Sequence, residues 1–147
     1  MKEVHLVVGV LAITLNGVAG VYGAWRWWRV APSAWFWRVL RAGQVMIVVQ
    51  VLLGGALVLA GHKPSGLHVL YGLLPLAVSL IGEQLRIASA QIVLDARGHG
   101  SAHAVGQLPE DEQRALVLTI VHRELGVMAL AALMIVVLLA RAAGTAG

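Results

Sequence analysis

The sequence contains no cysteine, and few of its 147 residues carry a charge. Without cysteine, disulfides, thiolate metal sites and cysteine-ligated iron–sulfur clusters are excluded. Charged residues make up 12% of the chain and hydrophobic residues 59%, against about 25% and about 45–50% in typical soluble proteins. A chain this short has too much surface for its volume to bury so many apolar residues in water. The composition therefore predicts an integral membrane protein and excludes a soluble enzyme, a disordered chain and a nucleic-acid-binding module.

Four apolar stretches are long enough to cross a bilayer, which takes about 20 residues in a helix. They cover residues 5–28, 36–61, 66–97 and 109–141. Short connections make neighbouring helices antiparallel, so we expect an all-α, up-down-up-down four-helix bundle forming a single domain, residues 1–147. The third and fourth helices are longer than a bilayer requires. We expect both to extend into the cytoplasm, where residues 98–108 form an exposed, flexible loop.

Lysine and arginine are distributed unevenly between the two ends of this bundle. One end has Lys2, Lys63 and Arg141, and the other has Arg26, Arg29, Arg38, Arg41, Arg86, Arg97, Arg114 and Arg123. Basic residues mark the cytoplasmic side, so both termini are predicted to lie outside. All five tryptophans fall within residues 25–37, as in an interfacial aromatic belt. We expect a multi-pass protein of the plasma (inner) membrane that contacts the lipid bilayer and has no nucleic-acid partner.

Two of the six histidines begin apolar stretches at the predicted outer face. His5 starts the first stretch and His68 starts the third. These two helices run in the same direction in an antiparallel bundle, so the two imidazoles are level and can point inward from opposite sides. A haem iron held by two histidines needs this arrangement. The alternative is that both histidines are interfacial side chains without a ligand.

Glycines accompany these histidines. Gly9 follows His5 by four residues, Gly72 follows His68 by four, and Gly54 and Gly55 lie on the second stretch. Residues four apart share a helix face, and a glycine there leaves space for a porphyrin edge. The alternative is close helix packing, which small residues also permit. We assign only packing to Gly17, Gly20 and Gly23.

The predicted outer loop carries His62 and Lys63. Above a haem at this face, these two groups and Lys2 are placed to bind the propionates by charge-assisted hydrogen bonds. His62 is also the alternative iron ligand if His68 has a structural role. The other interpretation is a solvated loop.

Part of the chain resembles heme A synthase. The similar residues are 50–58 (QVLLGGALV), Pro64 and 67–70 (LHVL). The family has a Gln-x-x-Leu-Gly-Gly-x-x-Val helix, a short outer loop and a Leu-His helix start, and residues 3–5 (EVH) match its glutamate before the first ligand histidine. The resemblance covers about residues 3–80 and implies that His5 and His68 are axial ligands of one b-type haem. This chain supplies one four-helix half where the family has two, and a homodimer would recreate the pair.

A second polar group is expected at the cytoplasmic interface. We expect Arg123 to pair with Glu83, and Glu124 to pair with Arg86 or Arg41, because charges at that depth find partners. A quinone headgroup site here, with His122 as a donor, is an alternative. His99 and His103 are interpreted as solvated loop residues, the alternative being a metal site completed by Asp95 or Glu110.

The function expected from these features is that of a membrane b-type cytochrome. It would serve electron transfer or haem handling, as a subunit of a larger respiratory assembly or as a homodimer. No nucleophile–base pattern, phosphate-binding loop or HExxH motif is present, so a stand-alone enzyme is disfavoured. The alternative is a cofactor-free structural accessory subunit of a membrane complex.

Overall fold

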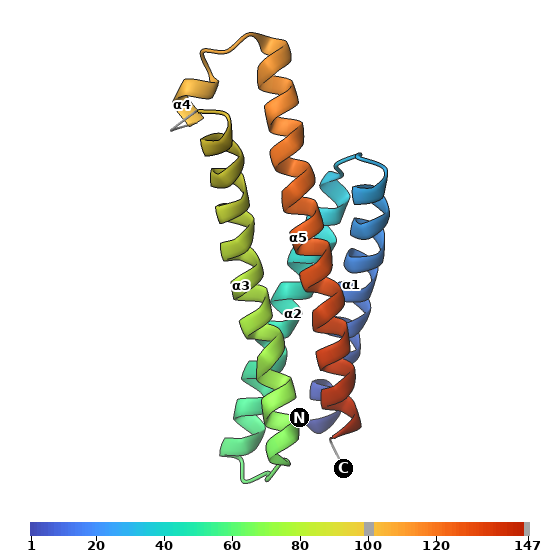
Figure 1. Cartoon of the computed structure of the whole chain (residues 1–147). Helices are drawn as coiled ribbons and strands as arrows, with labels where there is room; N and C mark the ends of the chain where they lie inside the picture. Colours follow the sequence, from blue (N-terminus) through green and yellow to red (C-terminus); the bar gives the residue numbers. More distant parts are fainter. Residues whose placement is uncertain (99–101, 146–147) are drawn as a thin grey trace.

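The computed structural model describes residues 1–98 and 102–145, and the secondary structure in these ranges is helical. Its elements are α1 (Lys2–Trp28), α2 (Ala34–Leu59), α3 (Gly66–Ala96), the one-turn helix α4 (Ala102–Val105) and α5 (Glu110–Gly144) (Figure 1). Within the described ranges, α1, α2, α3 and α5 are long and apolar enough to cross a membrane. Many exposed side chains are large and apolar, such as Leu6, Leu52 and Leu59. Such a surface suits lipid rather than water.

The four long helices begin and end within three residues of the predicted apolar stretches. The connection between α3 and α5 differs from the exposed loop that the sequence predicts, because it contains α4. The side chain of Gln113 ties this connection to α5 by donating to the carbonyls of Gly106 and Leu108. Residues 99–101 of the predicted loop lie outside the described residues. The alternating path across a membrane and the extension into the cytoplasm stay predictions.

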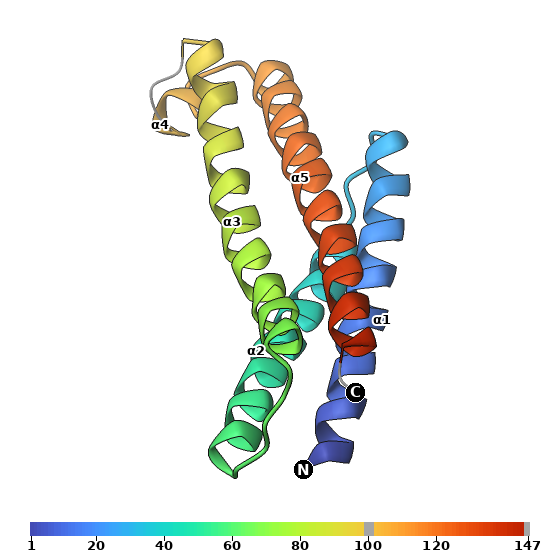
Figure 2. The same cartoon turned by 60° about the horizontal axis from the view of Figure 1, so that its bottom comes forward.

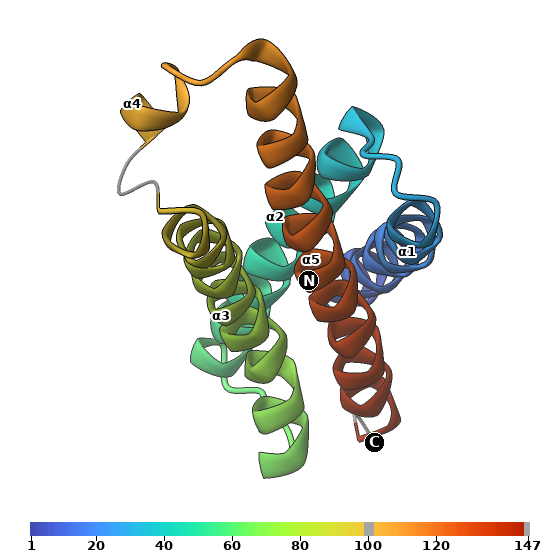
Figure 3. The ribbon, with the colours of Figure 1, turned by 45° about the horizontal axis from the view of Figure 1, so that its top comes forward.

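Helix α5 lies between α1 and α3 and packs along both, and α1 also packs along α2 (Figure 3). The contact between α2 and α3 is much the smallest of these four. Both termini lie at the end of the bundle where α2 connects to α3 (Figure 2). At the opposite end α3 and α5 extend beyond the α1–α2 connection (Figure 1). The bundle is therefore closed by three extensive seams and one sparse seam.

The α1–α2 seam is a row of glycine notches filled from the facing helix. Gly9 faces Gln50, Asn16 faces Gly43, and Gly23 faces Phe36. The pairs recur every seven residues on both helices, which is the spacing that keeps one face of a helix on its neighbour. A β-carbon at Gly43 would lie 2.8 Å from Nδ2 of Asn16, so a larger residue there would push the helices apart. These notches fix the register of α1 on α2, and with it the height of His5.

Similar notches join α5 to its neighbours. Gly20 receives Leu133, Gly126 receives Trp27, and Gly82 lies against Ala131. Small residues allow such close approach, which drives helix association in lipid. The packing role predicted for Gly20 and Gly23 is confirmed, and Gly17 makes an ordinary contact, 3.8 Å from Val136.

Candidate functional site

The structure brings His5 and His68 together at the end of the bundle that holds both termini. His5 lies in the first turns of α1 and His68 in the first turn of α3. Their ring centroids are 6.2 Å apart, and the ring planes are inclined by 58°. Both side chains are partly buried between the helices. Because the sequence separates them by more than 60 positions, only the helix arrangement can pair them.

The ring of His68 is oriented by the last turn of α5. Its Nδ1 lies 2.9 Å from the carbonyl oxygen of Ala142 and donates to it, so Nε2 carries the lone pair. The α3 start is held by Ser65, whose Oγ accepts from the His68 backbone N–H and donates to the Thr145 carbonyl. A carbonyl that accepts from one ring nitrogen is the usual support for a histidine that binds metal through the other. The hydrogen bond to Ala142 therefore fixes the ring of His68 and leaves its Nε2 as the nitrogen not used by α5.

The ring of His5 has one nitrogen engaged and one without a partner. Its Nε2 lies 3.2 Å from Nε2 of Gln50, which is seated in the notch at Gly9. Its Nδ1 is buried, as is Oε1 of Gln50, and neither has a hydrogen-bond partner among the described residues. A buried polar atom without a partner costs about 1–3 kcal/mol. A group bound at Nδ1 would remove that cost.

Gln50 can select which nitrogen of His5 is free. If its amide turns by 180°, Oε1 accepts from Nε2–H, and Nδ1 then carries the lone pair. The contact of Gln50 with His5 depends on the α1–α2 register. Gln50 thus supports His5 as Ala142 supports His68.

The separation of the two rings fits two ligands on opposite sides of one metal ion. A bond from a metal to an imidazole nitrogen is about 2 Å long, and the ring centre lies roughly 1 Å beyond that nitrogen. Two imidazoles on opposite faces of one iron therefore have centroids about 6 Å apart. The observed distance is 6.2 Å. Within the described ranges, no group of three or more His, Cys, Asp or Glu side chains could hold a metal, but a bis-histidine haem needs only two.

The glycines around the histidines have two different surroundings. Gly54 lies beneath His5, where a β-carbon would be 3.4 Å from the ring Cε1, and Gly9 holds Gln50. These two make room for the side chains of the site itself. By contrast, a β-carbon at Gly55 or Gly72 would meet nothing within 4 Å. Among glycines inside the described helices, excluding terminal helix residues, only these two face open space.

The residues of the α2–α3 loop lie apart from the histidine pair in the contacts they make. Nδ1 of His62 lies 3.2 Å from the carbonyl oxygen of Leu57, and Lys63 is exposed. Arg141 is a cation that sequence analysis did not assign to the site, and its guanidinium lies over the ring of Tyr71, 5.6 Å from the centroid. The antiparallel pairing of α3 with α5 brings Arg141 to the His68 end.

A charge network occupies the other end of the bundle. Glu83 of α3 accepts hydrogen bonds from Arg41 and Gln44 of α2 and from Arg86, which also reaches Glu124 of α5 at 3.5 Å. The predicted pair of Glu124 with Arg86 is confirmed.

The predicted pair of Arg123 with Glu83 is wrong. Successive helix residues point about 100° apart, and Glu124 faces α3 while Arg123 is exposed. Glu83 is instead neutralised by Arg41 and Arg86, on α2 and on its own helix.

The remaining histidines are described in part. His122 stacks on Trp27 with centroids 5.4 Å apart, and its Nδ1 is buried without a partner among the described residues. Trp27 fills the notch at Gly126 beside it, and a quinone site here stays a prediction. His103 is exposed on α4, and His99 lies outside the described residues.

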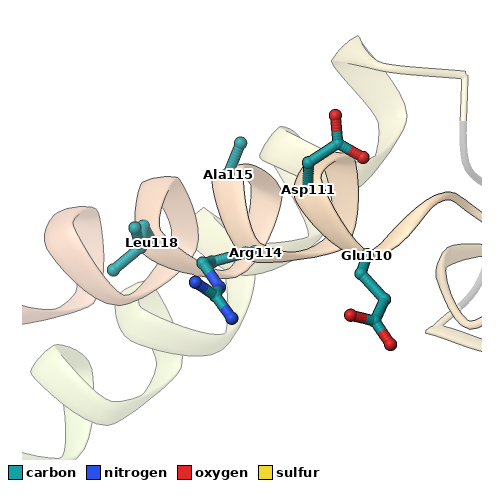
Figure 4. A pocket seen from close by; sticks show the side chains of 5 residues that line it. All are labelled: Glu110, Asp111, Arg114, Ala115 and Leu118. Carbon is teal, nitrogen blue, oxygen red and sulfur yellow. The ribbon is translucent and has the colours of Figure 1, made fainter.

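Three acidic residues stand at the start of the last helix. Glu110, Asp111 and Glu112 form the first turn of α5. A hollow beside this turn is lined by Glu110, Asp111, Arg114, Ala115 and Leu118 (Figure 4). It is open to the surface, and its acidic and basic groups suit a solvated helix start.

Comparison with models of protein families, with curated proteins and with solved structures finds no match. The resemblance of residues 3–80 to heme A synthase therefore rests on the motifs alone. The chemistry of the site has to be inferred from the geometry of His5, His68 and their supporting groups.

Proposed function

We propose that this protein is a membrane b-type haem protein that binds one haem between His5 and His68. The observation that carries the proposal is the meeting of two imidazoles from α1 and α3 at a centroid distance of 6.2 Å. That distance suits two axial ligands of one iron. Nε2 of His68, whose ring is held by Ala142, and the unpartnered Nδ1 of His5 are the two nitrogens available to the iron. Bound haem supplies reversible one-electron transfer at iron.

The surrounding residues have separate roles in this proposal. Ala142 and Gln50 hold the two imidazoles, and Gly72, four residues after His68, leaves space on the same helix face. The carboxylates of the propionates accept hydrogen bonds from side chains at this end, namely Lys2, His62, Lys63 and Arg141. Charge-assisted hydrogen bonds of this kind are stronger than those between neutral groups.

The proposed topology is an up-down-up-down crossing of the plasma (inner) membrane with both termini outside. The arginine-rich α1–α2 connection then lies in the cytoplasm, as do the extended ends of α3 and α5. A single haem at one face does not carry electrons across the bilayer. The protein therefore works with a partner subunit of a respiratory assembly or with a second copy of itself, in electron transfer or haem handling.

Visible spectroscopy of the purified protein tests the haem proposal. The protein is expressed with haem supplementation, extracted in mild detergent, and measured oxidised and dithionite-reduced. We expect the spectrum of a six-coordinate, low-spin b-type haem, at one haem per chain. His5→Ala and His68→Ala should each abolish that spectrum, whereas His103→Ala removes an exposed histidine on α4, outside the site, and should retain it. A colourless wild-type protein, or a spectrum that survives both ligand substitutions, contradicts the proposal.

A cofactor-free structural subunit is the second candidate, and one observation favours it. Each histidine already joins two helices, His5 to α2 through Gln50 and His68 to α5 through Ala142. A stapling role predicts that His5→Ala and His68→Ala lower the melting temperature of protein prepared without haem. The haem proposal predicts that each substitution lowers the melting temperature much more in protein prepared with haem than in protein prepared without it. Melting curves of the two preparations therefore distinguish the candidates.

A further inference from the structure

The end of α1, the turn 29–33 and the start of α2 form a corner of the molecule, which we call the α1–α2 corner. Two pairs of tryptophan and arginine lie on one surface of it. Trp25 of α1 precedes Arg29, the C-cap residue of that helix, by four residues, and on α2 Trp35 precedes Arg38 by three. Residues at these spacings share a helix face. All four side chains are exposed. The ring of Tyr22 contacts both tryptophans, at centroid distances of 5.8 and 5.1 Å, so the two pairs lie on the same side of the molecule.

The turn that joins these pairs is held in place by its own side chains. Arg26 donates to the carbonyls of Ala31 and Pro32, at 2.6 and 3.1 Å. The hydroxyl of Tyr22 lies 3.1 Å from Oγ of Ser33 in a hydrogen bond. Arg26 is thus used inside the corner, and Arg29 and Arg38 remain on its surface. Their positions are fixed by the turn before any ligand binds.

The two exposed arginines have no acidic partner in the part of the chain that the structure describes. The salt bridges there use Arg41 and Arg86. No aspartate or glutamate occurs between Glu3 and Glu83, so α2 and the adjoining turn contain no carboxylate. The corner therefore presents two positive charges that a negatively charged ligand can neutralise.

A shallow, open groove lies on the face of α1 next to this corner. It is lined by Gly17, Val18, Val21, Tyr22 and Trp25, all on α1. From Gly17 to Trp25 the helix rises about 12 Å, at 1.5 Å per residue. One leaflet contributes about 15 Å of hydrocarbon, half of the bilayer core. The groove therefore has the length and the chemistry to hold an acyl chain.

We propose that this surface binds an anionic phospholipid, with its phosphate at Arg29 and Arg38 and an acyl chain in the groove. Indole rings lie at the depth of headgroups, where Trp25 and Trp35 flank the phosphate position. The corner is also the end that the distribution of arginine assigns to the cytoplasm, the side where anionic lipids attract basic segments. The site is independent of haem binding and uses none of the residues around His5 and His68.

Native mass spectrometry of detergent-solubilised protein, titrated with phosphatidylglycerol or phosphatidylethanolamine of the same acyl chains, tests the site. We expect phosphatidylglycerol to bind more tightly, and R29Q/R38Q to weaken it roughly 30-fold while weakening phosphatidylethanolamine much less, because its ammonium group offsets the phosphate charge. The figure follows from about 1 kcal/mol per basic residue near an anionic surface, at 1.4 kcal/mol per tenfold. R97Q/R114Q removes two exposed arginines outside the corner and should leave the preference intact.

Two further measurements test whether the acyl chain binds in the groove and whether the arginines bind any phosphate without a lipid chain. Val21→Trp fills the groove from an exposed position and should weaken both lipids. Glycerol phosphate in excess should not displace phosphatidylglycerol, because it has no chain for the groove. Equal binding of the two lipids, equal losses in R29Q/R38Q and R97Q/R114Q, or full displacement by glycerol phosphate would each overturn the proposal. Melting curves of every variant establish that it is folded.

Discussion

Replacing Gly72 by leucine should remove the proposed haem without lowering the stability of the haem-free protein. A β-carbon at Gly72 would meet nothing within 4 Å, so the larger side chain enters open space. The position is inside α3, where leucine is favoured over glycine by roughly 0.5–1 kcal/mol. Gly72→Leu protein prepared without haem should therefore melt at the wild-type temperature or slightly above it. The five tryptophans supply the fluorescence signal for that measurement.

The same substitution should remove haem. Gly72 is four residues after His68 and shares its helix face, so a leucine side chain there occupies space beside the ligand. We expect the haem content per chain to fall to less than about a tenth of wild type, a loss of about 1.4 kcal/mol or more in binding. Gly66→Leu is the matched control, because Gly66 is also open but begins α3 on the far side of His68. Normal haem content in Gly72→Leu would refute the assignment of this space to the cofactor.

Four other substitutions test the packing, the charge network and the support of His5. Gly23→Ala should lower the free energy of unfolding by about 1–3 kcal/mol, because a β-carbon there meets the buried ring of Phe36, and thermal melting measures it. Glu83→Gln should lower that free energy by about 1–2 kcal/mol, because two arginines lose their partly exposed carboxylate. Glu124→Gln, with one 3.5 Å contact, should lower it less; the reverse order contradicts the central role of Glu83. Gln50→Leu should weaken haem binding about 10–100-fold in a spectroscopic titration, as loss of a group that supports a ligand does, and unchanged affinity would assign Gln50 to packing alone.

The four long helices could be predicted because their signal is local. Each is an uninterrupted apolar stretch, and in lipid the backbone of such a stretch satisfies its own hydrogen bonds only as a helix. The notches of the α1–α2 seam were not predicted, although their seven-residue spacing is visible in the sequence once the pairing is known. Assigning Gly9 to Gln50 needs the register of two helices, and apolar composition does not specify a register.

The candidate site, too, could be predicted only as far as it does not depend on how the helices are rotated and aligned. The meeting of His5 with His68 could be predicted from helix direction alone, because both residues begin parallel stretches. The contacts of His5 with Gln50 and of His68 with Ala142 could not, because each depends on rotation of a helix about its axis. The error at Arg123 has this cause as well, since the adjacent residue Glu124 points toward α3.

The position of the open space connects the packing to the proposed function. Side chains fill the glycine notches on the α1–α2 and α1–α5 seams, whereas a β-carbon at Gly72 of α3 would meet nothing within 4 Å. Helices α2 and α3 also make the smallest of the principal interhelix contacts. A cofactor beside His68 would therefore add contacts where the polypeptide supplies fewest. Because a ligand that binds only the folded state stabilises it, haem should slow amide hydrogen exchange most strongly in the halves of α2 and α3 that lie nearest the two histidines. Uniform slowing across all four long helices would instead indicate that the α2–α3 seam is not where the cofactor acts.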